Sequence, residues 1–238
     1  MPVIMTAILS NLQAVHTAID QAALMAQRDA AEITLLAVSK TVPASVIRAA
    51  CSAGQQAFGE NFVQEALDKM SGLRDLPLQW HFIGPIQSNK TRAIAENFSW
   101  VHSVDRLKIA QRLSEQRPAN LPPLNVCLQI NVSGEATKGG VAADEAEALA
   151  HAIAILPRLQ LRGLMAIPAL AAELAAQRAP FAQMRKLLQK LNMAGLKMDT
   201  LSMGMSNDMT AAILEGATIV RVGTAIFGSR NQELKNIM

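Results

Sequence analysis

Hydrophobic and polar positions along the chain change their period in a regular way. Residues 5–29 place apolar side chains at helical spacing, which predicts an amphipathic helix ahead of the first strand. Short apolar runs rich in Ile, Leu and Val then alternate with helical patterns. The predicted strands are 33–40, 56–59, 79–83, 99–101, 125–131, 160–165, 200–202 and 218–222. The predicted helices that follow them are 44–53, 61–70, 88–96, 105–116, 143–156, 180–193 and 207–215, with a last turn or helix from Thr224.

Eight strand–helix repeats favour an α/β fold, a single (β/α)8 TIM barrel at the small end of the usual size range. A doubly wound open sheet is the alternative. No linker or low-complexity tract divides the 238 residues. We therefore expect one domain over 1–238, with 1–30 as a flanking N-terminal helix.

The first predicted strand, 33–40, ends in a lysine. Both of its faces are apolar until that last residue, as expected of a parallel strand that is covered on both sides. Lys40 would then lie at the carboxyl end of the strand, where α/β folds bind ligands, and its amine is a candidate nucleophile. The alternative is a lysine that simply points into water.

Strand alternation predicts which side chains enter the barrel. The polar face of 125–131 is expected to line the interior, and it consists of Asn125, Cys127, Gln129 and Asn131. Arg221 lies on the opposite face of its strand from Val220 and Val222. If Arg221 points inward, it puts a fixed positive charge at the barrel mouth beside Lys40. The alternative is a surface salt bridge.

The last two strand ends have the composition of phosphate-binding loops. Gly204–Asp208 and Arg221–Thr224 each combine glycine with a hydroxyl residue and lead toward a helix. Free backbone amides at such a start, together with Ser or Thr hydroxyls, bind phosphate. The loops after strands seven and eight are the usual phosphate site of these barrels. The alternative is that Ser206 and Asn207 are only helix N-caps and Gly223 only a turn.

Two further side chains are candidates for chemistry. His81, near the end of the third strand, is a candidate base or ring-stacking partner, and a structural histidine is the alternative. Lys138, in the loop Gly134–Gly140, is either a second amine over the mouth or a solvated charge. No cluster has metal-ligand spacing, so no metal site is predicted.

Composition narrows the class of protein. The 22 Lys and Arg residues against 19 Asp and Glu give a net charge of +3 without a basic block, which argues against nucleic acid. No apolar run is long enough to span a bilayer, and no secretory signal is visible, so no membrane partner is expected. Two cysteines do not make a disulfide framework, so a cytoplasmic location is expected.

A lysine, a phosphate cradle and an inward arginine across one mouth match pyridoxal 5′-phosphate (PLP), whose aldehyde forms a Schiff base with lysine. Seven segments between Leu35 and Gly228 also carry a resemblance: LLAVSKTVP, FGENFVQEA, WHFIGPIQSNK, INVSGEATKGG, LRGLMAI, LSMGMSNDM and VRVGTAIFG. Together they resemble the pyridoxal phosphate homeostasis proteins, the PLP-binding proteins of the YggS/PROSC type.

The resemblance implies a barrel of the alanine racemase N-terminal kind (PLP fold type III) without a C-terminal β domain. It implies that Lys40 is the Schiff-base lysine and that Arg221 faces the pyridine nitrogen and disfavours its protonation. It also implies roles for the remaining residues: Ser206, Gly223 and Thr224 would hold the phosphate, with Ser202 near by, and Asn61 would line the ring.

This sequence departs from the family pattern in three places. Val42 stands where a lysine or similar polar residue is usual, so no neighbouring amine is expected at this position. Gly84-Pro85-Ile86-Gln87 replaces the usual Gly-His-Leu-Gln, and Lys138-Gly139-Gly140 replaces Lys-Ser-Gly. Lys138 itself is retained, which is consistent with a second PLP-accepting site.

Two functions from different classes fit these residues. The first is a protein without catalytic residues that carries and buffers PLP and delivers it to apo PLP enzymes, so influencing amino-acid and keto-acid balance. The second is a PLP-dependent amino-acid racemase, which needs an acid or base on each face of the cofactor. The related racemases take one base from a tyrosine of a second domain, and this chain contains no tyrosine. We expect the carrier, and we expect a monomer.

Overall fold

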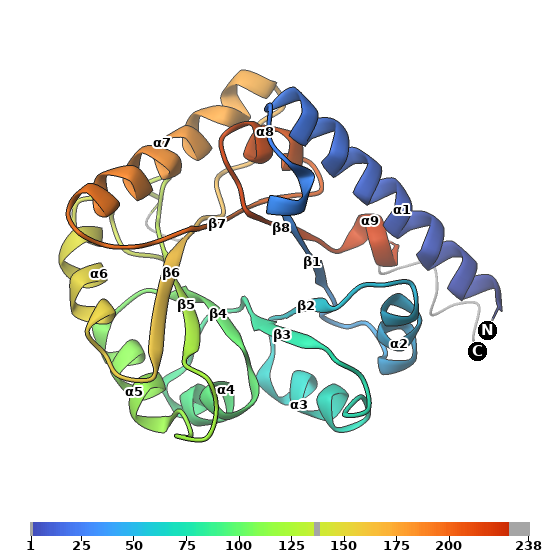
Figure 1. The fold of residues 1–238 in the computed structure, drawn as a ribbon, viewed down its shortest axis with the longest axis horizontal. Coiled ribbons are helices and arrows are strands. Elements are labelled where there is room, and N and C mark those ends of the chain that lie inside the picture. Colours follow the sequence, from blue (N-terminus) through green and yellow to red (C-terminus); the bar gives the residue numbers. More distant parts are fainter. Residues whose placement is uncertain (1, 136–138, 229–238) are drawn as a thin grey trace.

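The computed structural model describes residues 2–135 and 139–228, which form a closed barrel of eight parallel strands in chain order, with helices outside it (Figure 1). The strands are β1 Thr34–Val38, β2 Ala57–Glu60, β3 Gln79–Phe82, β4 Trp100–Val104, β5 Leu124–Gln129, β6 Leu159–Met165, β7 Thr200–Met205 and β8 Ile219–Val222. The helices are α1 Pro2–Met25, α2 Ala44–Ser52, α3 Val63–Ser71, α4 Thr91–Asn97, α5 Leu107–Gln116, α6 Ala146–Ala154, α7 Leu174–Met193, α8 Met209–Leu214 and α9 Thr224–Phe227, with 3₁₀ turns η1 Ala30–Glu32 and η2 Ser88–Lys90.

Pairing between the first and last strands closes the barrel. β1 pairs with β8 in parallel, from Thr34 opposite Ile219 to Ala37 opposite Val222. The predicted (β/α)8 barrel is therefore confirmed, and the open-sheet alternative is wrong.

The two faces of each strand pack against different partners. The barrel interior holds a small apolar cluster: Leu36, Ala57, Trp100, Cys127, Met165 and Ile219. The alternate residues, such as Val126 and Leu128 of β5, join the larger core between strands and helices. Cys127 thus lies on the face that was predicted to look inward, as the two-residue period of a strand requires.

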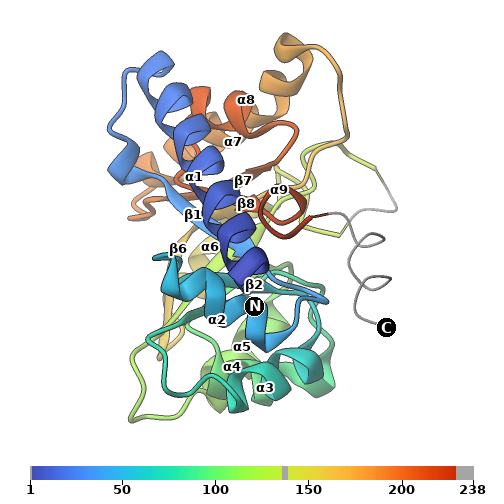
Figure 2. The same cartoon turned by 90° about the vertical axis from the view of Figure 1, so that its right-hand side faces the viewer.

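Helix α1 covers the outside of the barrel where α9 is short. Figures 1 and 2 show it along one side of the molecule, beside α8 and α9. It buries a stripe of side chains three or four residues apart: Ile8, Leu12, Val15, Ile19, Ala22 and Ala23. Asn11 on the same face donates from Nδ2 to the carbonyl oxygen of Ile226 in α9 at 2.9 Å. The expected flanking helix is therefore part of the barrel wall.

Several predicted boundaries differ from the structure. The first strand ends at Val38 rather than at Lys40. Two other boundaries are wrong for identifiable reasons. Helix α7 does not begin at Pro180 but at Leu174, with the proline inside it. Its first turns are anchored by tertiary contacts, including Arg178 Nε to Glu215 Oε1 at 2.7 Å. β4 does not end at Val101 but continues to Val104, because its polar residues are buried and hydrogen-bonded rather than exposed at the rim.

Candidate functional site

The residues predicted to bind a cofactor come from four neighbouring strands, β7, β8, β1 and β2, or from the loops that follow them. Five follow the carboxyl ends of these strands: Lys40 after β1, Asn61 after β2, Ser206 after β7, and Gly223 and Thr224 after β8. Two lie deeper, Ser202 within β7 and Arg221 within β8. Parallel strands open their carboxyl ends at one end of the barrel, so the fold gathers all seven at one mouth.

Lys40 is held on a tight turn at the end of β1. The residue is half-buried, and its ammonium makes no hydrogen bond or ion pair with any residue that the structure describes. The Val42 amide donates to the Ser39 carbonyl at 2.9 Å and closes the turn. Thr41, the third residue of the turn, has φ 65°, a conformation that glycine normally supplies. The turn therefore fixes the backbone from which a free amine projects.

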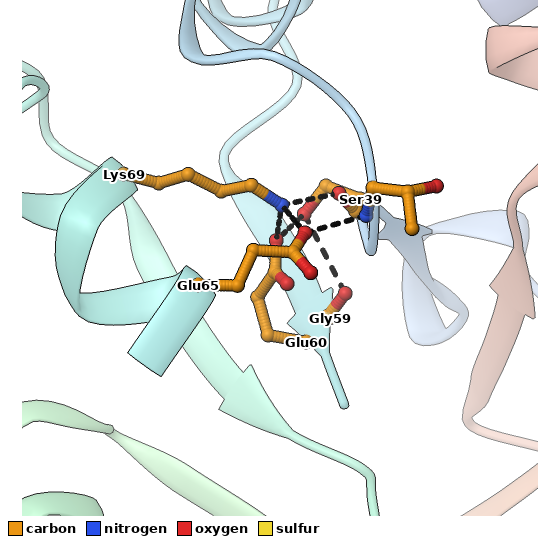
Figure 3. A network of polar contacts seen from close by, with 6 residues as sticks. Ser39, Gly59, Glu60, Glu65 and Lys69 are labelled. Carbon is orange, nitrogen blue, oxygen red and sulfur yellow. Dashed lines mark hydrogen bonds and ion pairs between the residues drawn. The ribbon is translucent and has the colours of Figure 1, made fainter. Parts of the chain in front are cut away.

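An ionic network lies beside Ser39, at the start of this turn (Figure 3). Lys69 Nζ donates to the Ser39 carbonyl at 2.7 Å and to Glu60 Oε1 at 2.8 Å, and it also pairs with Glu65 Oε1. The hydroxyl of Ser39 donates to Glu60 Oε1 at 2.7 Å, and the amide of Thr41 donates to Glu65 Oε1. The network thus contacts the residues on both sides of Lys40.

Glu60 and Lys69 were not predicted from the sequence. Burial raises the pKa of Glu60, while the hydrogen bonds from Lys69 and Ser39 oppose that rise. Glu60 lies at the end of β2, and Lys69 follows Glu65 by four residues on α3, so the two helix residues share a face. The four-residue spacing of Glu65 and Lys69 was the signal that the sequence offered. It could not reveal that this face of α3 is directed toward the end of β1.

Arg221 is buried inside the barrel, with 4% of its surface exposed. Nη1 donates to the Ser202 carbonyl at 2.6 Å and to Ser202 Oγ at 2.8 Å, and Nη2 donates to the Ala166 carbonyl at 2.9 Å. No carboxylate within the described ranges forms an ion pair with it, so the surface salt-bridge alternative is wrong. Burial lowers the pKa of Arg221 to about 10, which leaves the guanidinium charged at neutral pH.

A chain of hydrogen bonds links Arg221 to the far end of the barrel interior. His102 Nδ1 lies 2.7 Å from Ser202 Oγ, and His102 Nε2 lies 2.9 Å from His81 Nδ1. His81 Nε2 lies 3.1 Å from Gln79 Oε1. Because this oxygen only accepts, one consistent arrangement follows: each ring is neutral and carries its proton on Nε2, and the Ser202 hydroxyl donates to His102.

Burial keeps these groups in their neutral forms. It lowers the pKa of His81 to about 3, and it lowers that of His102 well below the usual value, with the nearby His81 and Arg221 adding to the effect. His81 also stacks on Trp100 with ring centroids 5.4 Å apart. Burial raises the pKa of the Cys127 thiol to about 12. The structure therefore favours the structural interpretation of His81, and Cys127 stays a neutral thiol at neutral pH.

The loops after β7 and β8 present free polar groups at the mouth. Ser206, Asn207 and Thr224 are exposed, and the hydroxyls of Ser206 and Thr224 make no hydrogen bond with a described residue. The N-cap of α8 is Asp208, so neither Ser206 nor Asn207 is an N-cap. A Cβ on Gly223 would lie 3.2 Å from the Val38 carbonyl oxygen, a contact tighter than most side chains make. Glycine is therefore suited to this close approach of β8 to β1.

Asn61 and two of the positions that depart from the family pattern, Val42 and Pro85, also lie at this end of the barrel. Asn61 Oδ1 is buried and has no partner among the described residues. A Cβ on Gly84 would lie 2.2 Å from the Asn61 carbonyl oxygen, so only glycine fits there. Pro85 is exposed, and Val42 is partly buried against the main core. Lys138 lies outside the described residues.

The opposite end of the barrel has cavities of its own. One of about 350 Å³ is lined by residues around the starts of β1, β2 and β3, and one of about 390 Å³ by residues around the starts of β1, β4, β7 and β8. The charges there are already paired, because Arg162 pairs with Asp199 at 2.7 Å and lies over the Trp100 ring. Over the described part of the chain, no group of His, Cys, Asp and Glu could hold a metal, and no helix is long and apolar enough to cross a bilayer.

The model of the alanine racemase N-terminal domain family matches residues 7–231. The chain belongs to this family. A pyridoxal phosphate homeostasis protein of Pseudomonas aeruginosa is 64% identical over 227 residues, which are 95% of this chain and 97% of that protein. The protein of the same name from Escherichia coli (strain K12) is 53% identical over 234 residues, which are 97% of this chain and 100% of that protein.

A solved structure adds a ligand to the comparison. PipY of Synechococcus elongatus PCC7942, determined with PLP bound, is 39% identical with a TM-score of 0.80, over 93% of this chain and 100% of that chain. The relatives confirm the family that the seven sequence segments resemble.

Proposed function

We propose that this protein binds PLP at the carboxyl end of its barrel, as a Schiff base on Lys40, and that it carries, buffers and delivers the cofactor. The names of the curated relatives and the PLP-bound PipY structure support the ligand and the homeostatic role. Two groups carry the proposal for this chain. The Lys40 amine follows β1 and has no partner among the described residues, and the buried Arg221 lies on β8, which pairs with β1, and forms no ion pair with a described carboxylate.

The polar groups at the carboxyl end of the barrel fit the aldehyde, the phosphate and the ring of PLP. The Lys40 amine would take the aldehyde. The hydroxyls of Ser206 and Thr224 and the close backbone approach at Gly223 would hold the phosphate. Asn61, with a buried oxygen that lacks a partner, would line the ring. Ser202 would act indirectly, because it holds the Arg221 guanidinium.

Arg221 suits a carrier better than a carbanion-forming enzyme. A guanidinium that stays charged at neutral pH can only donate, so it would bind the pyridine nitrogen in its unprotonated form. Bound PLP supplies an electrophilic aldehyde and an electron sink, and the sink is weaker when the ring nitrogen is not protonated. The residue thus favours holding the cofactor over activating a substrate.

A PLP-dependent racemase is the second candidate, and the surroundings of the mouth argue against it. Racemisation needs a second acid or base. The sequence has no tyrosine, and His81 and Cys127 are buried inside the barrel with pKa values far from neutrality. Lys138, the candidate second amine in the sequence, is the remaining side chain that could serve as that base. We therefore propose a protein without its own turnover, at home in the cytoplasm, whose partners are PLP and apo forms of PLP enzymes.

The absorbance spectrum of the purified protein, before and after borohydride reduction, tests this proposal. The wild type should show a Schiff-base band at roughly 420 nm, and peptide mapping should find the reduced pyridoxyl group on Lys40. Lys40→Ala should lose the band, whereas Lys108→Ala, on exposed α5 surface, should keep it. A band that persists in Lys40→Ala, or an adduct on Lys138 alone, would contradict the assignment. Turnover of either enantiomer in a chiral amino-acid assay would favour the racemase.

A further inference from the structure

The two peptide groups that join Lys40 to the chain are both held by side chains of one helix. The carbonyl of the Ser39–Lys40 peptide accepts from Lys69 Nζ at 2.7 Å. The amide of the Lys40–Thr41 peptide donates to Glu65 Oε1. Glu65 and Lys69 are four residues apart on α3 and pair with each other, so they form one rigid clamp (Figure 3).

The clamp is supported by the buried carboxylate of Glu60. Glu60 is fully buried and accepts hydrogen bonds from Lys69 and Ser39. Together with the Ser39 carbonyl and Glu65, it gives the Lys69 ammonium three acceptors. An ammonium has three protons, and here each has an acceptor. Lys69 is therefore fully committed to the backbone and the two carboxylates, and it is not available as a second nucleophile.

The turn that the clamp holds has an unfavourable backbone conformation at Thr41. Thr41 is β-branched and adopts φ 65°, which costs energy that glycine would avoid. Without an acceptor for its amide, the turn would relax toward ordinary backbone angles. The Lys40 side chain projects from the second residue of the same turn, so such a relaxation would redirect its amine.

We propose that Glu65 and Lys69 are positioning residues for Lys40: they hold the turn in the conformation that aims the amine at the PLP aldehyde. This inference rests on the proposed function. Neither side chain needs to touch the cofactor, since both act through the backbone. A shift of the order of 1 Å in a reacting atom slows a reaction up to about a hundredfold, so a loosened turn should delay bond formation rather than abolish binding.

The test measures two ligands on the same apo-protein variants. PLP reports formation of the Schiff base, which is followed as the rate at which the absorbance band appears after mixing. Pyridoxamine 5′-phosphate carries the same ring and phosphate but no aldehyde, so its affinity reports the pocket without Lys40 chemistry. Glu65→Ala should slow the PLP reaction about tenfold to a hundredfold and leave pyridoxamine phosphate affinity unchanged. Glu65→Gln retains an oxygen acceptor for the Thr41 amide and should restore most of the rate.

A matched control comes from another Lys–Glu pair. Glu147 pairs with Lys190 at 3.0 Å on the outside of the barrel, and it is partly exposed, as Glu65 is. Glu147→Ala should leave both ligands as in the wild type. Should Glu65→Ala fail to fold, Glu65→Leu keeps more of the side-chain volume, still removes the acceptor of the Thr41 amide and carries the same comparison.

The outcomes separate this inference from the proposed function. A wild type that gives no reduced adduct on Lys40 would overturn the proposed function. A normal wild type with a Glu65→Ala variant that reacts at the same rate would overturn the positioning role alone. Equal losses for PLP and pyridoxamine phosphate would also overturn it, because the clamp would then support the whole pocket rather than the amine.

Discussion

Two lysines at the carboxyl end of the barrel show how surroundings decide what an amine can do. Lys69 has three acceptors around its ammonium, two of them carboxylate oxygens. Lys40 lies beside this network and makes no bond to any described side chain or backbone group. The same functional group is thus a structural cation in one position and a candidate nucleophile in the other.

The buried histidines give the protein a pH-dependent stability at acid pH. In an unfolded chain a histidine takes up a proton near pH 6.5, whereas burial holds the pKa of His81 at about 3 and that of His102 well below its usual value. The unfolded state therefore binds more protons as the pH falls. Stability that is present above about pH 6.5 is lost toward pH 4, at up to about 1.4 kcal/mol per pH unit for each histidine.

We expect His81→Gln to reduce this slope by about the share of one histidine. Urea denaturation at several pH values between 7.5 and 4.5 measures the free energy of unfolding for both proteins. The exposed His151 provides the control, and His151→Gln should follow the wild type. Identical slopes for wild type and His81→Gln would show that His81 is not held neutral in the fold.

Individual residues were predictable where a local rule applied. Alternation along a strand was sufficient to direct Arg221 inward, because its neighbours Val220 and Val222 pack against the helices. The bond between His81 and His102 joins residues 21 positions apart, and that between His102 and Ser202 joins residues 100 positions apart. No spacing along the chain encodes such contacts, so they emerged only from the fold.

At the scale of elements, α1 contributes stability that its position at the start of the chain does not suggest. Leu12 is 3% exposed within the α1 stripe, whereas Leu9 on the other side of the helix is 50% exposed. Leu12→Ala should lower the free energy of unfolding by about 2–5 kcal/mol, because it leaves a cavity against the barrel. Leu9→Ala should change it by less than about 0.5 kcal/mol. Chemical denaturation measures both, and equal small effects would mean that α1 does not support the barrel.

The order and type of elements followed from the sequence, because each strand and helix has its own hydrophobic period. Their ends did not always follow. Pro180 looked like a helix start, since proline is favoured in a first turn, yet contacts of Arg178 with Glu215 extend α7 beyond it. The fourth strand was predicted to end at Val101, before His102, since polar side chains are usually exposed, yet a buried partner keeps His102 within β4. Tertiary contacts overrode local preference in both cases.

At the scale of the whole molecule, the proposed site is complete within one copy of the chain. All seven predicted cofactor residues come from β7, β8, β1 and β2 or the loops after them. No second copy is needed to supply a group, so we expect a monomer. Gel filtration with light scattering should give the mass of one chain, 25.5 kDa, with and without added PLP. A stable dimer at micromolar concentration would contradict this expectation.

The pairing of β1 with β8 has a consequence for the newly made chain. Lys40, Glu65 and Lys69 emerge early from the ribosome, but Arg221, Gly223 and Thr224 emerge about 150 to 180 residues later. The last strand is therefore also the last part of the proposed PLP site to be synthesised. Until β8 docks against β1, Lys40 follows a strand whose edge is unpaired, and its amine has no binding site around it. We expect PLP binding to begin only once translation has passed Thr224. Cofactor loading would then follow the synthesis of almost the whole barrel.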